Sequence, residues 1–420
     1  MVLEELDGWF GTAWPLSVAF MARLAIEVMD LAFVGHLGTK YLAAASLATM
    51  WTETTSAWVW QGFSGAINVL SSNARGANNR PLIGVWWMLA SWVMLVLCVP
   101  IAIAFWFTPS VMEGLGFQEG ESELAGTYAR YFALQLPPFF LWVAANGFLQ
   151  GGLQLTYPAL VVNLTCLGLN FFLNAILIHG PQFFSSSASN SSSSFLNWSG
   201  LGFIGSPLAT ATTRWLSLAF LFLFMGTCGR RAVCSALPTP RQGVKESCSW
   251  RRFRELTIRQ AAPLVVGNLL EDIQLQVIAF MAAGMGQVQL AAHNSMLTLF
   301  FFATTLQWGG LKASTIRIGH YLGARDIARA KMVYWIHLSV AGIVAAGIAG
   351  FFIGAGEAIG HLFSSDPAVW EIFRELSILS GSGYIALSLF FSAVGLLQGQ
   401  GRPSRVGIAF VVGAWLVAVP

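Results

Sequence analysis

Acidic side chains inside long apolar stretches are the residues of this sequence that could do chemistry. The stretch from about 9 to 34 contains Arg23, Glu27 and Asp30. Offsets of four and seven residues from Arg23 place all three side chains on one face of a helix. A later apolar stretch contains Glu271 close to its middle. Because a charge in hydrocarbon is costly, these carboxylates are candidates for binding a proton or another cation.

The first of these stretches also has a structural interpretation. Arg23 and Glu27, one helical turn apart, could form an ion pair that leaves Asp30 free to gain and lose a proton. Alternatively, the charges stabilise one end of the helix, since Asp30 lies near its boundary. Glu53, in the next apolar stretch, is a further candidate for a polar pocket.

The stretch that contains Glu271 carries other polar side chains. Asp272 lies 100° around a helix from Glu271 and needs a partner of its own, for which Lys312 is a candidate. Gln276 follows five residues after Glu271 and is a candidate pocket residue.

Three amides share one face of the apolar stretch from about 155 to 179. Asn163, Asn170 and Asn174 are separated by seven and four residues. An unsatisfied amide in hydrocarbon is expensive, so each needs a partner. They either join two helices by hydrogen bonds, or Asn170 and Asn174 share a pocket with Asp30.

The elements that position these residues are membrane helices. The mean hydropathy is +0.66 and only 10% of residues are charged, against about 25% in soluble domains. An apolar run of about 20 residues is long enough to cross a bilayer. We expect an all-α, multi-pass membrane protein with spans at about 9–34, 45–72, 85–107, 124–147, 155–179, 203–225, 258–282, 292–316, 333–360, 376–397 and 404–420.

The chain contains the same pattern twice, at an offset of 248 residues. Pro15 returns as Pro263, and the segments GHLGTKYLAAAS and FLQGG return as AGMGQVQLAAHN and LLQGQ. A repeat of half a chain indicates two fused bundles of similar fold. We expect one lobe over 1–229, a basic linker over 230–257 and a second lobe over 258–420.

The charges of the predicted loops set the orientation. With the N-terminus in the cytoplasm, the inside loops contain sixteen of the 22 Lys and Arg residues, whereas the outside loops contain Lys40 and Arg374. The first residues are acidic, including Glu4 and Glu5, so we expect no signal peptide. The predicted location is the plasma membrane or a vacuolar or other organellar membrane.

Other motifs add little chemistry. A serine-rich outside loop contains the glycosylation motifs at Asn190 and Asn197. The five cysteines have no metal-ligand or redox spacing, and we expect them to be reduced. No nucleotide-binding loop, catalytic constellation or metal-ligand spacing is present, so we expect no enzyme, no metal, no cofactor and no nucleic-acid partner.

Several motifs, in order along the chain, resemble those of the multidrug and toxic compound extrusion (MATE) family. The first is Asp30 with the segment FVGHLGTKYLAAASLA, in which the carboxylate lies four residues before V-G-x-L-G. The others are SSNARGANN, FLQGGLQLTYP, STIRIGHYLGAR and GLLQGQGRP. The resemblance covers nearly the whole chain. It implies twelve helices in two six-helix lobes, arranged as a V around a central cleft. It also implies a monomer that exports organic cations or other amphipathic small molecules in exchange for H⁺ or Na⁺.

The resemblance assigns roles by position. Asp30 and Glu271 match the family's coupling carboxylates, and Asn170 and Asn174 match the partners of the first. Gln276 departs from the family, because related plant and animal proteins commonly have glutamate there. The second copy reaches Pro420, so we expect about eleven of the twelve helices.

Two other functions remain open at this point. A lipid or lipid-linked saccharide flippase of related fold would need a strongly basic cavity. An inactive, truncated member is favoured by the missing helix and opposed by the retained Asp30 and Glu271.

Overall fold

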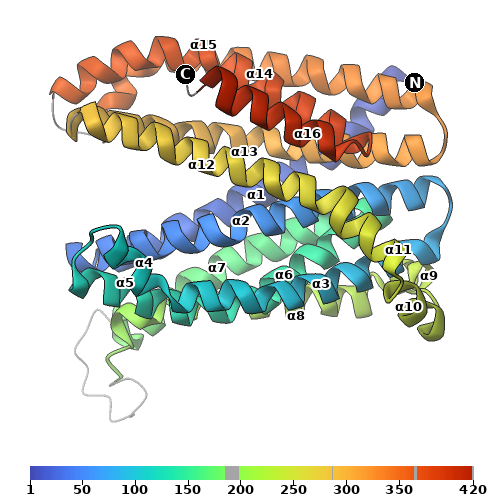
Figure 1. The fold of residues 1–420 in the computed structure, drawn as a ribbon, viewed down its shortest axis with the longest axis horizontal. Coiled ribbons are helices and arrows are strands. Elements are labelled where there is room, and N and C mark those ends of the chain that lie inside the picture. Colours follow the sequence, from blue (N-terminus) through green and yellow to red (C-terminus); the bar gives the residue numbers. More distant parts are fainter. Residues whose placement is uncertain (185–197, 286, 364–366, 419–420) are drawn as a thin grey trace.

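The computed structural model describes residues 1–184, 198–285, 287–363 and 367–418, which form helices and short connections without a strand (Figure 1). The glycosylation motifs predicted at Asn190 and Asn197 lie outside the described residues. Each predicted span falls on a helical segment, because an apolar chain in a bilayer must satisfy its backbone hydrogen bonds internally. The last, predicted at 404–420, falls on two short elements, α16 (Pro403–Phe410) and η6 (Val411–Ala418), as far as residue 418.

The first half of the chain contains six long helical segments. A short 3₁₀ turn and a π turn, η1 and η2, extend α5 and α6 into one continuous segment. Prolines at the starts of α3 and α7 fit helix N-termini, where the missing N–H costs nothing. The elements are α1 (Val2–Gly35), α2 (Thr39–Gly76), α3 (Arg80–Trp106), α4 (Thr108–Gly114), α5 (Glu119–Phe132), η1 (Ala133–Gln135), α6 (Leu136–Gly147), η2 (Phe148–Gly152), α7 (Tyr157–His179), η3 (Pro181–Phe184), η4 (Gly202–Ile204) and α8 (Gly205–Gly226).

The second half follows three short helices that occupy the basic segment expected as a linker. After these short helices, the π-helical segment η5 continues directly into α12. The elements are α9 (Arg230–Ala236), α10 (Pro240–Ser247), α11 (Trp250–Phe253), η5 (Arg254–Ala261), α12 (Ala262–Met285), α13 (Gln287–Gly323), α14 (Ile327–Phe363), α15 (Pro367–Gly399), α16 (Pro403–Phe410) and η6 (Val411–Ala418).

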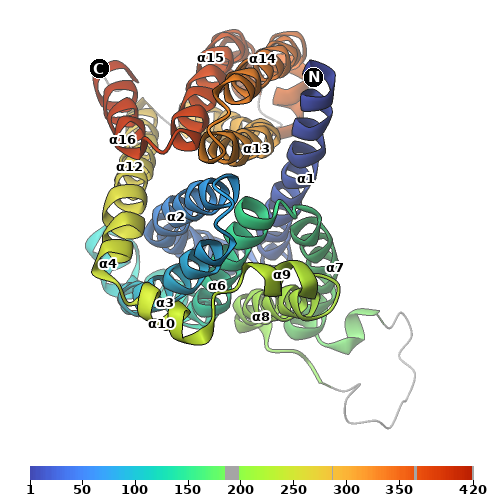
Figure 2. The ribbon, with the colours of Figure 1, turned by 90° about the vertical axis from the view of Figure 1, so that its right-hand side faces the viewer.

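Within the described ranges, six helical segments are long and apolar enough to cross a membrane by length and composition alone. They are Arg80–Trp106, Glu119–Gly152, Tyr157–His179, Gly202–Gly226, Ile327–Ala355 and Arg374–Gly399. In Figure 2, the long helices α2 and α13 lie toward the middle of the molecule, and α12 and α1 run along its two sides and link the halves. Polar residues of these helices therefore face other helices, which is where intramembrane charge is tolerated.

Two helices cross from one half of the molecule to the other. In both views α1 begins beside α13 and α14 and ends among α7 and α8 (Figures 1 and 2). Likewise, α12 starts beside α11 and α3 and ends in the layer of α13 to α16. Because α1 and α12 are related by the internal repeat, each half contributes one helix that extends across the interface.

The two halves are packed against each other at one end, through glycines. A Cβ atom on Gly76 of α2 would overlap the carbonyl oxygen of His320 on α13. One on Gly323 would overlap the carbonyl oxygen of Asn73. Only a missing side chain permits backbones to approach this closely. At the other end the helices of the two halves diverge (Figure 1), which gives the V-shaped arrangement expected.

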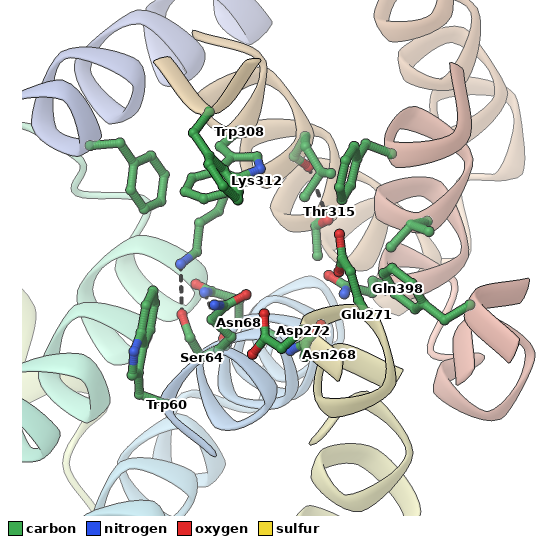
Figure 3. Close-up of a pocket in the computed structure, with 18 of the residues that line it drawn as sticks. Trp60, Ser64, Asn68, Asn268, Glu271, Asp272, Trp308, Lys312, Thr315 and Gln398 are labelled. Carbon is green, nitrogen blue, oxygen red and sulfur yellow. Dashed lines mark hydrogen bonds between the residues drawn. The ribbon is translucent and has the colours of Figure 1, made fainter. Parts of the chain in front are cut away.

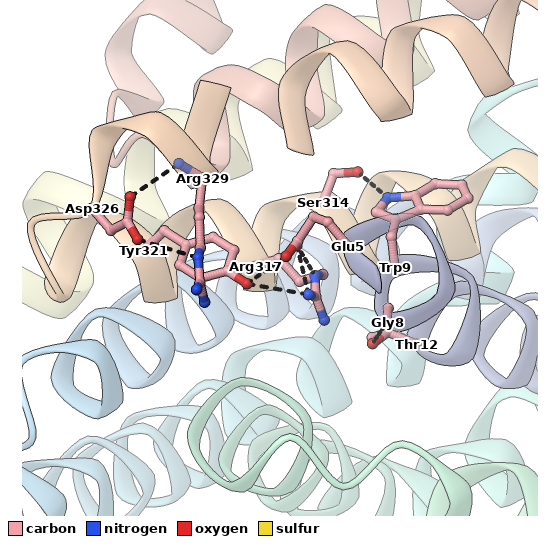
Figure 4. Close-up of polar contacts among 9 residues, drawn as sticks. All are labelled: Glu5, Gly8, Trp9, Thr12, Ser314, Arg317, Tyr321, Asp326 and Arg329. Carbon is pink, nitrogen blue, oxygen red and sulfur yellow. Dashed lines mark hydrogen bonds and ion pairs between the residues drawn. The ribbon is translucent and has the colours of Figure 1, made fainter. Parts of the chain in front are cut away.

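A charged cluster ties α1 to α13 at the closed end (Figure 4). Arg317 donates to Glu5 Oε1 from Nε at 2.8 Å and from Nη2 at 2.5 Å, and Tyr321 donates to Glu5 Oε2 at 2.7 Å. One turn along, Trp9 donates from its indole N–H to Ser314 at 2.7 Å. Glu5 is only 6% exposed, so its charge depends on these donors.

We expect Glu5→Gln to destabilise the closed end. The change leaves the Arg317 guanidinium without a counter-charge, and breaking such a buried pair costs about 3 kcal/mol. The apparent Tm of the purified protein should fall by several degrees. Glu4→Gln, at an exposed position one residue away, is the matched control. Equal melting of the two variants would contradict the importance of the pair.

Candidate functional site

A pocket of about 170 Å³ lies between the two halves of the molecule. Helices α1, α2, α12, α13, α15 and α16 all contribute to its wall (Figure 3). Its aromatic lining consists of Phe20, Trp60, Phe301, Trp308, Phe391 and Phe410. Its polar lining consists of Gln61, Ser64, Asn68, Asn268, Glu271, Asp272, Lys312, Thr315 and Gln398. An aromatic wall with a few convergent polar groups is typical of small-molecule sites.

Both carboxylates of α12 line this pocket. Glu271 and Asp272 point into it from neighbouring positions of the helix (Figure 3). In the described part of the chain, neither forms an ion pair, and Asp272 Oδ2 is buried without a hydrogen-bond partner. Among the described residues, no basic side chain lies within 4.0 Å of either carboxylate.

Lys312 does not pair with Asp272, the partner that we considered for it. Its ammonium instead donates to Ser64 Oγ at 2.6 Å (Figure 3). Ser64 and Lys312 are 248 residues apart, the same offset as the internal repeat. They therefore occupy equivalent positions of α2 and α13. Because equivalent residues of two related halves can contact each other only near the axis that relates the halves, this contact lies at the pseudo-two-fold axis.

Asp30 lies in a second polar cluster, within the first half. It is 4% exposed and accepts hydrogen bonds from Asn174 Nδ2 at 2.7 Å and Thr210 Oγ1 at 2.5 Å. Asn174 also donates to Asn170 Oδ1 at 3.0 Å. The three residues expected to share a pocket are thus together. Thr210 on α8 completes the cluster.

Arg23, Glu27 and Glu53 form a separate ionic group. Arg23 pairs with Glu27 at 3.1 Å, lies 4.0 Å from Glu53 and stacks over the Trp60 ring at 4.2 Å. The ion pair expected within α1 is therefore present. Its geometry leaves Asp30 outside the pair, as that interpretation requires.

Two other polar residues lie away from the pocket between the halves. Gln276 is exposed and does not line it. Five residues turn a helix by about 140°, so Gln276 cannot share the direction of Glu271. Asn163 donates to the Ala19 carbonyl oxygen at 3.0 Å. It joins α7 to α1, which is the structural alternative for this residue.

Sequence reasoning missed Thr210, Ser64 and Asn68. Nothing in their apolar surroundings distinguishes these small polar residues from the many that bond to their own helix. Only Ser64 had a usable signal, because the repeat offset maps it onto Lys312.

The comparison with protein families agrees with this architecture. The MatE family model matches residues 15–176 and 263–420. The second match begins 248 residues after the first, at the offset of the internal repeat. The two matches together cover well over half of the chain.

Curated relatives match along almost the whole chain. An uncharacterized transporter of Schizosaccharomyces pombe is 25% identical over 99% of this chain and 72% of its own length. Multidrug and toxin extrusion protein 1 of Mus musculus is 24% identical over 100% of this chain and 69% of the mouse protein. The Homo sapiens protein of the same name is also 24% identical, over 99% of this chain and 68% of its own length.

Solved structures show the same fold. The eukaryotic MATE transporter AtDTX14 superposes with a TM-score of 0.86 at 18% identity, over 100% of this chain and 88% of that one. The Vibrio cholerae MATE transporter VcmN in its bent form gives a TM-score of 0.85 at 16% identity, over 100% and 89%. With the two lobes, the central pocket and the family match, the chain belongs to the MatE family of multi-pass membrane transporters.

Proposed function

We propose that this protein is a secondary antiporter that exports organic cations or other amphipathic small molecules in exchange for H⁺ or Na⁺. The observation that carries this proposal is the pair of separated carboxylate sites. Asp30 is enclosed within one half, whereas Glu271 lines the pocket between the halves. One site can bind the coupling ion while the other binds substrate, an arrangement that allows exchange when the two ligands favour different states.

The charge of the loops supports an outward-facing state. The N-terminus, the α2–α3 turn, helices α9 to α11 and the α13–α14 turn all lie at the closed end (Figure 1). These segments contain most of the basic residues, which favours a cytoplasmic location for this end. The halves are then closed toward the cytoplasm and separated toward the outside.

The cluster around Asp30 contains an acceptor for the hydrogen bond that a protonated Asp30 would donate. As a carboxylate, Asp30 accepts from Asn174 Nδ2 and Thr210 Oγ1. A protonated Asp30 would become a donor and need an acceptor instead. Asn174 Oδ1 is buried and has no hydrogen-bond partner. Protonation therefore favours a rotation of the Asn174 amide and a repacking of α1 against α7.

Helix α1 connects this repacking to the interface. Its second half carries Asp30, and its first half is bound to α13 through Glu5 and Trp9. A shift of α1 caused by ion binding would therefore change how the halves meet. The ion and the substrate are coupled as far as their affinities differ between the two arrangements.

The charge of the pocket favours this function over a flippase for pyrophosphate-linked lipids. Two carboxylates, Glu271 and Asp272, line it against the single cationic side chain of Lys312. A doubly charged phosphate group would be repelled by that balance.

We expect Glu271→Gln to abolish transport driven by an ion gradient, because the pocket loses a titratable, cation-binding group. Uptake of ethidium into proteoliposomes, with an imposed H⁺ or Na⁺ gradient in separate experiments, should fall at least tenfold. Glu119→Gln, at an exposed site on α5, is the matched control. Unchanged exchange in Glu271→Gln would refute the role of this carboxylate.

We expect Asp30→Asn to reduce the dependence of substrate affinity on the coupling ion. The amide cannot bind a proton, so the ratio of the ethidium Kd values at pH 5 and pH 8 should be smaller in Asp30→Asn than in the wild type, which binds more weakly at pH 5; titration of Glu271 in the pocket accounts for the remainder. Fluorescence titration of protein in nanodiscs measures both. Thr210→Val, which removes one hydrogen bond of about 1 kcal/mol, should retain the pH dependence but shift its midpoint. A pH dependence as large in Asp30→Asn as in the wild type would place proton binding elsewhere.

A further inference from the structure

We propose that Lys312 forms an anion-recognising subsite in the central pocket, so that this transporter binds amphoteric substrates more tightly than matched simple cations. Such an amphoteric molecule carries a protonated amine at one end and a carboxylate at the other, joined by a flat apolar body. This inference rests on the proposed function, namely that the pocket between the halves binds the transported molecule.

Lys312 brings a positive charge to the pocket that no described carboxylate neutralises. Its ammonium has three N–H donors, of which Ser64 Oγ accepts one at 2.6 Å. The ring of Phe20 lies 5.4 Å away and provides a weak cation–π contact. Within the described ranges no carboxylate oxygen lies within 4.0 Å of this ammonium.

The neighbouring cation, Arg23, is different in this respect. It is paired with Glu27 at 3.1 Å and stacked on Trp60 at 4.2 Å. Arg23 lines a smaller cavity of about 30 Å³ and is not part of the central pocket, whereas Lys312 lines both. An anionic group of a ligand in the central pocket would therefore meet Lys312.

The opposite charge lies across the pocket. Figure 3 shows Lys312 and Glu271 on opposite sides, with Asn68 and Asp272 between them. Trp308 and Trp60 form part of the apolar wall beside the lysine. The pocket thus presents an apolar surface with a cationic group at one side and carboxylates at the other.

The balance of charge selects against simpler ligands. A ligand with only a positive charge leaves the ammonium of Lys312 without a counter-charge once water is displaced, and this is costly. A ligand with only a negative charge leaves the carboxylates in the same situation. If one of the two adjacent carboxylates, Glu271 or Asp272, is protonated, one negative and one positive group remain in the pocket, which matches an amphoteric molecule. An unpaired charge of this kind acts as a specificity element.

Two matched probes test this inference. We would measure competition of 4-(aminomethyl)benzoate, which is amphoteric, and its methyl ester, which is only cationic, against ethidium bound to protein in nanodiscs. The two differ by the charge of one carboxylate. The wild type should bind the acid at least tenfold more tightly than the ester. An ester that competes as well as the acid, or better, would overturn the proposal.

Variants locate the effect at Lys312. Lys312→Met keeps the length of the side chain without its charge and should bring the ratio of the two affinities close to 1. Lys312→Arg should restore the preference for the acid. Lys331→Met, which removes the charge of an exposed lysine outside the pocket, should preserve it. A preference that survives in Lys312→Met, with an elution profile like that of the wild type, would contradict the assignment. If ethidium fails to bind the wild type at all, the proposed function itself fails.

Discussion

The burial of Asp30 is the constraint on which the rest of the molecule depends. A carboxylate that is 4% exposed inside a helical bundle needs donors from other helices. Asn174 on α7 and Thr210 on α8 supply them. These bonds fix where α1 lies against its own half. Since α1 also packs on α13 in the other half, the proposed binding of a proton or cation at Asp30 would have consequences at the interface.

The two halves meet through contacts that favour discrete arrangements. Gly76 and Gly323 bring backbones together so closely that neither helix can slide without separation of the pair. The ion pair of Glu5 and Arg317 adds a bond that must be broken as a unit. Tightly packed interfaces change between distinct states more readily than they deform. In the proposed exchange, the pocket between the halves would then be exposed to one side or the other, as alternating access requires.

Sequence patterns predicted the parts of this structure that follow from helical geometry and repetition. The two halves and the grouping of Asp30 with Asn170 and Asn174 follow from such patterns. The remainder depends on how helices pack against one another. The position of Thr210 beside Asp30 joins residues 180 apart, and no local pattern encodes it. Lys312 is a candidate partner of Asp272 by sequence, but α2 and α13 meet in such a way that it contacts Ser64, its equivalent in the first copy of the repeat.

The most direct test of the central claim is a distance measured across the open end of the V. Spin labels at Glu119 on α5 and Met285 at the end of α12, two exposed positions in opposite halves, would report it by electron–electron double resonance. If ion binding at Asp30 controls how the halves meet, the distance distribution shifts between pH 8 and pH 5 in otherwise native protein. The shift disappears when Asp30 is replaced by asparagine. A distribution that ignores pH, or that responds to it equally in the asparagine variant, would contradict the account.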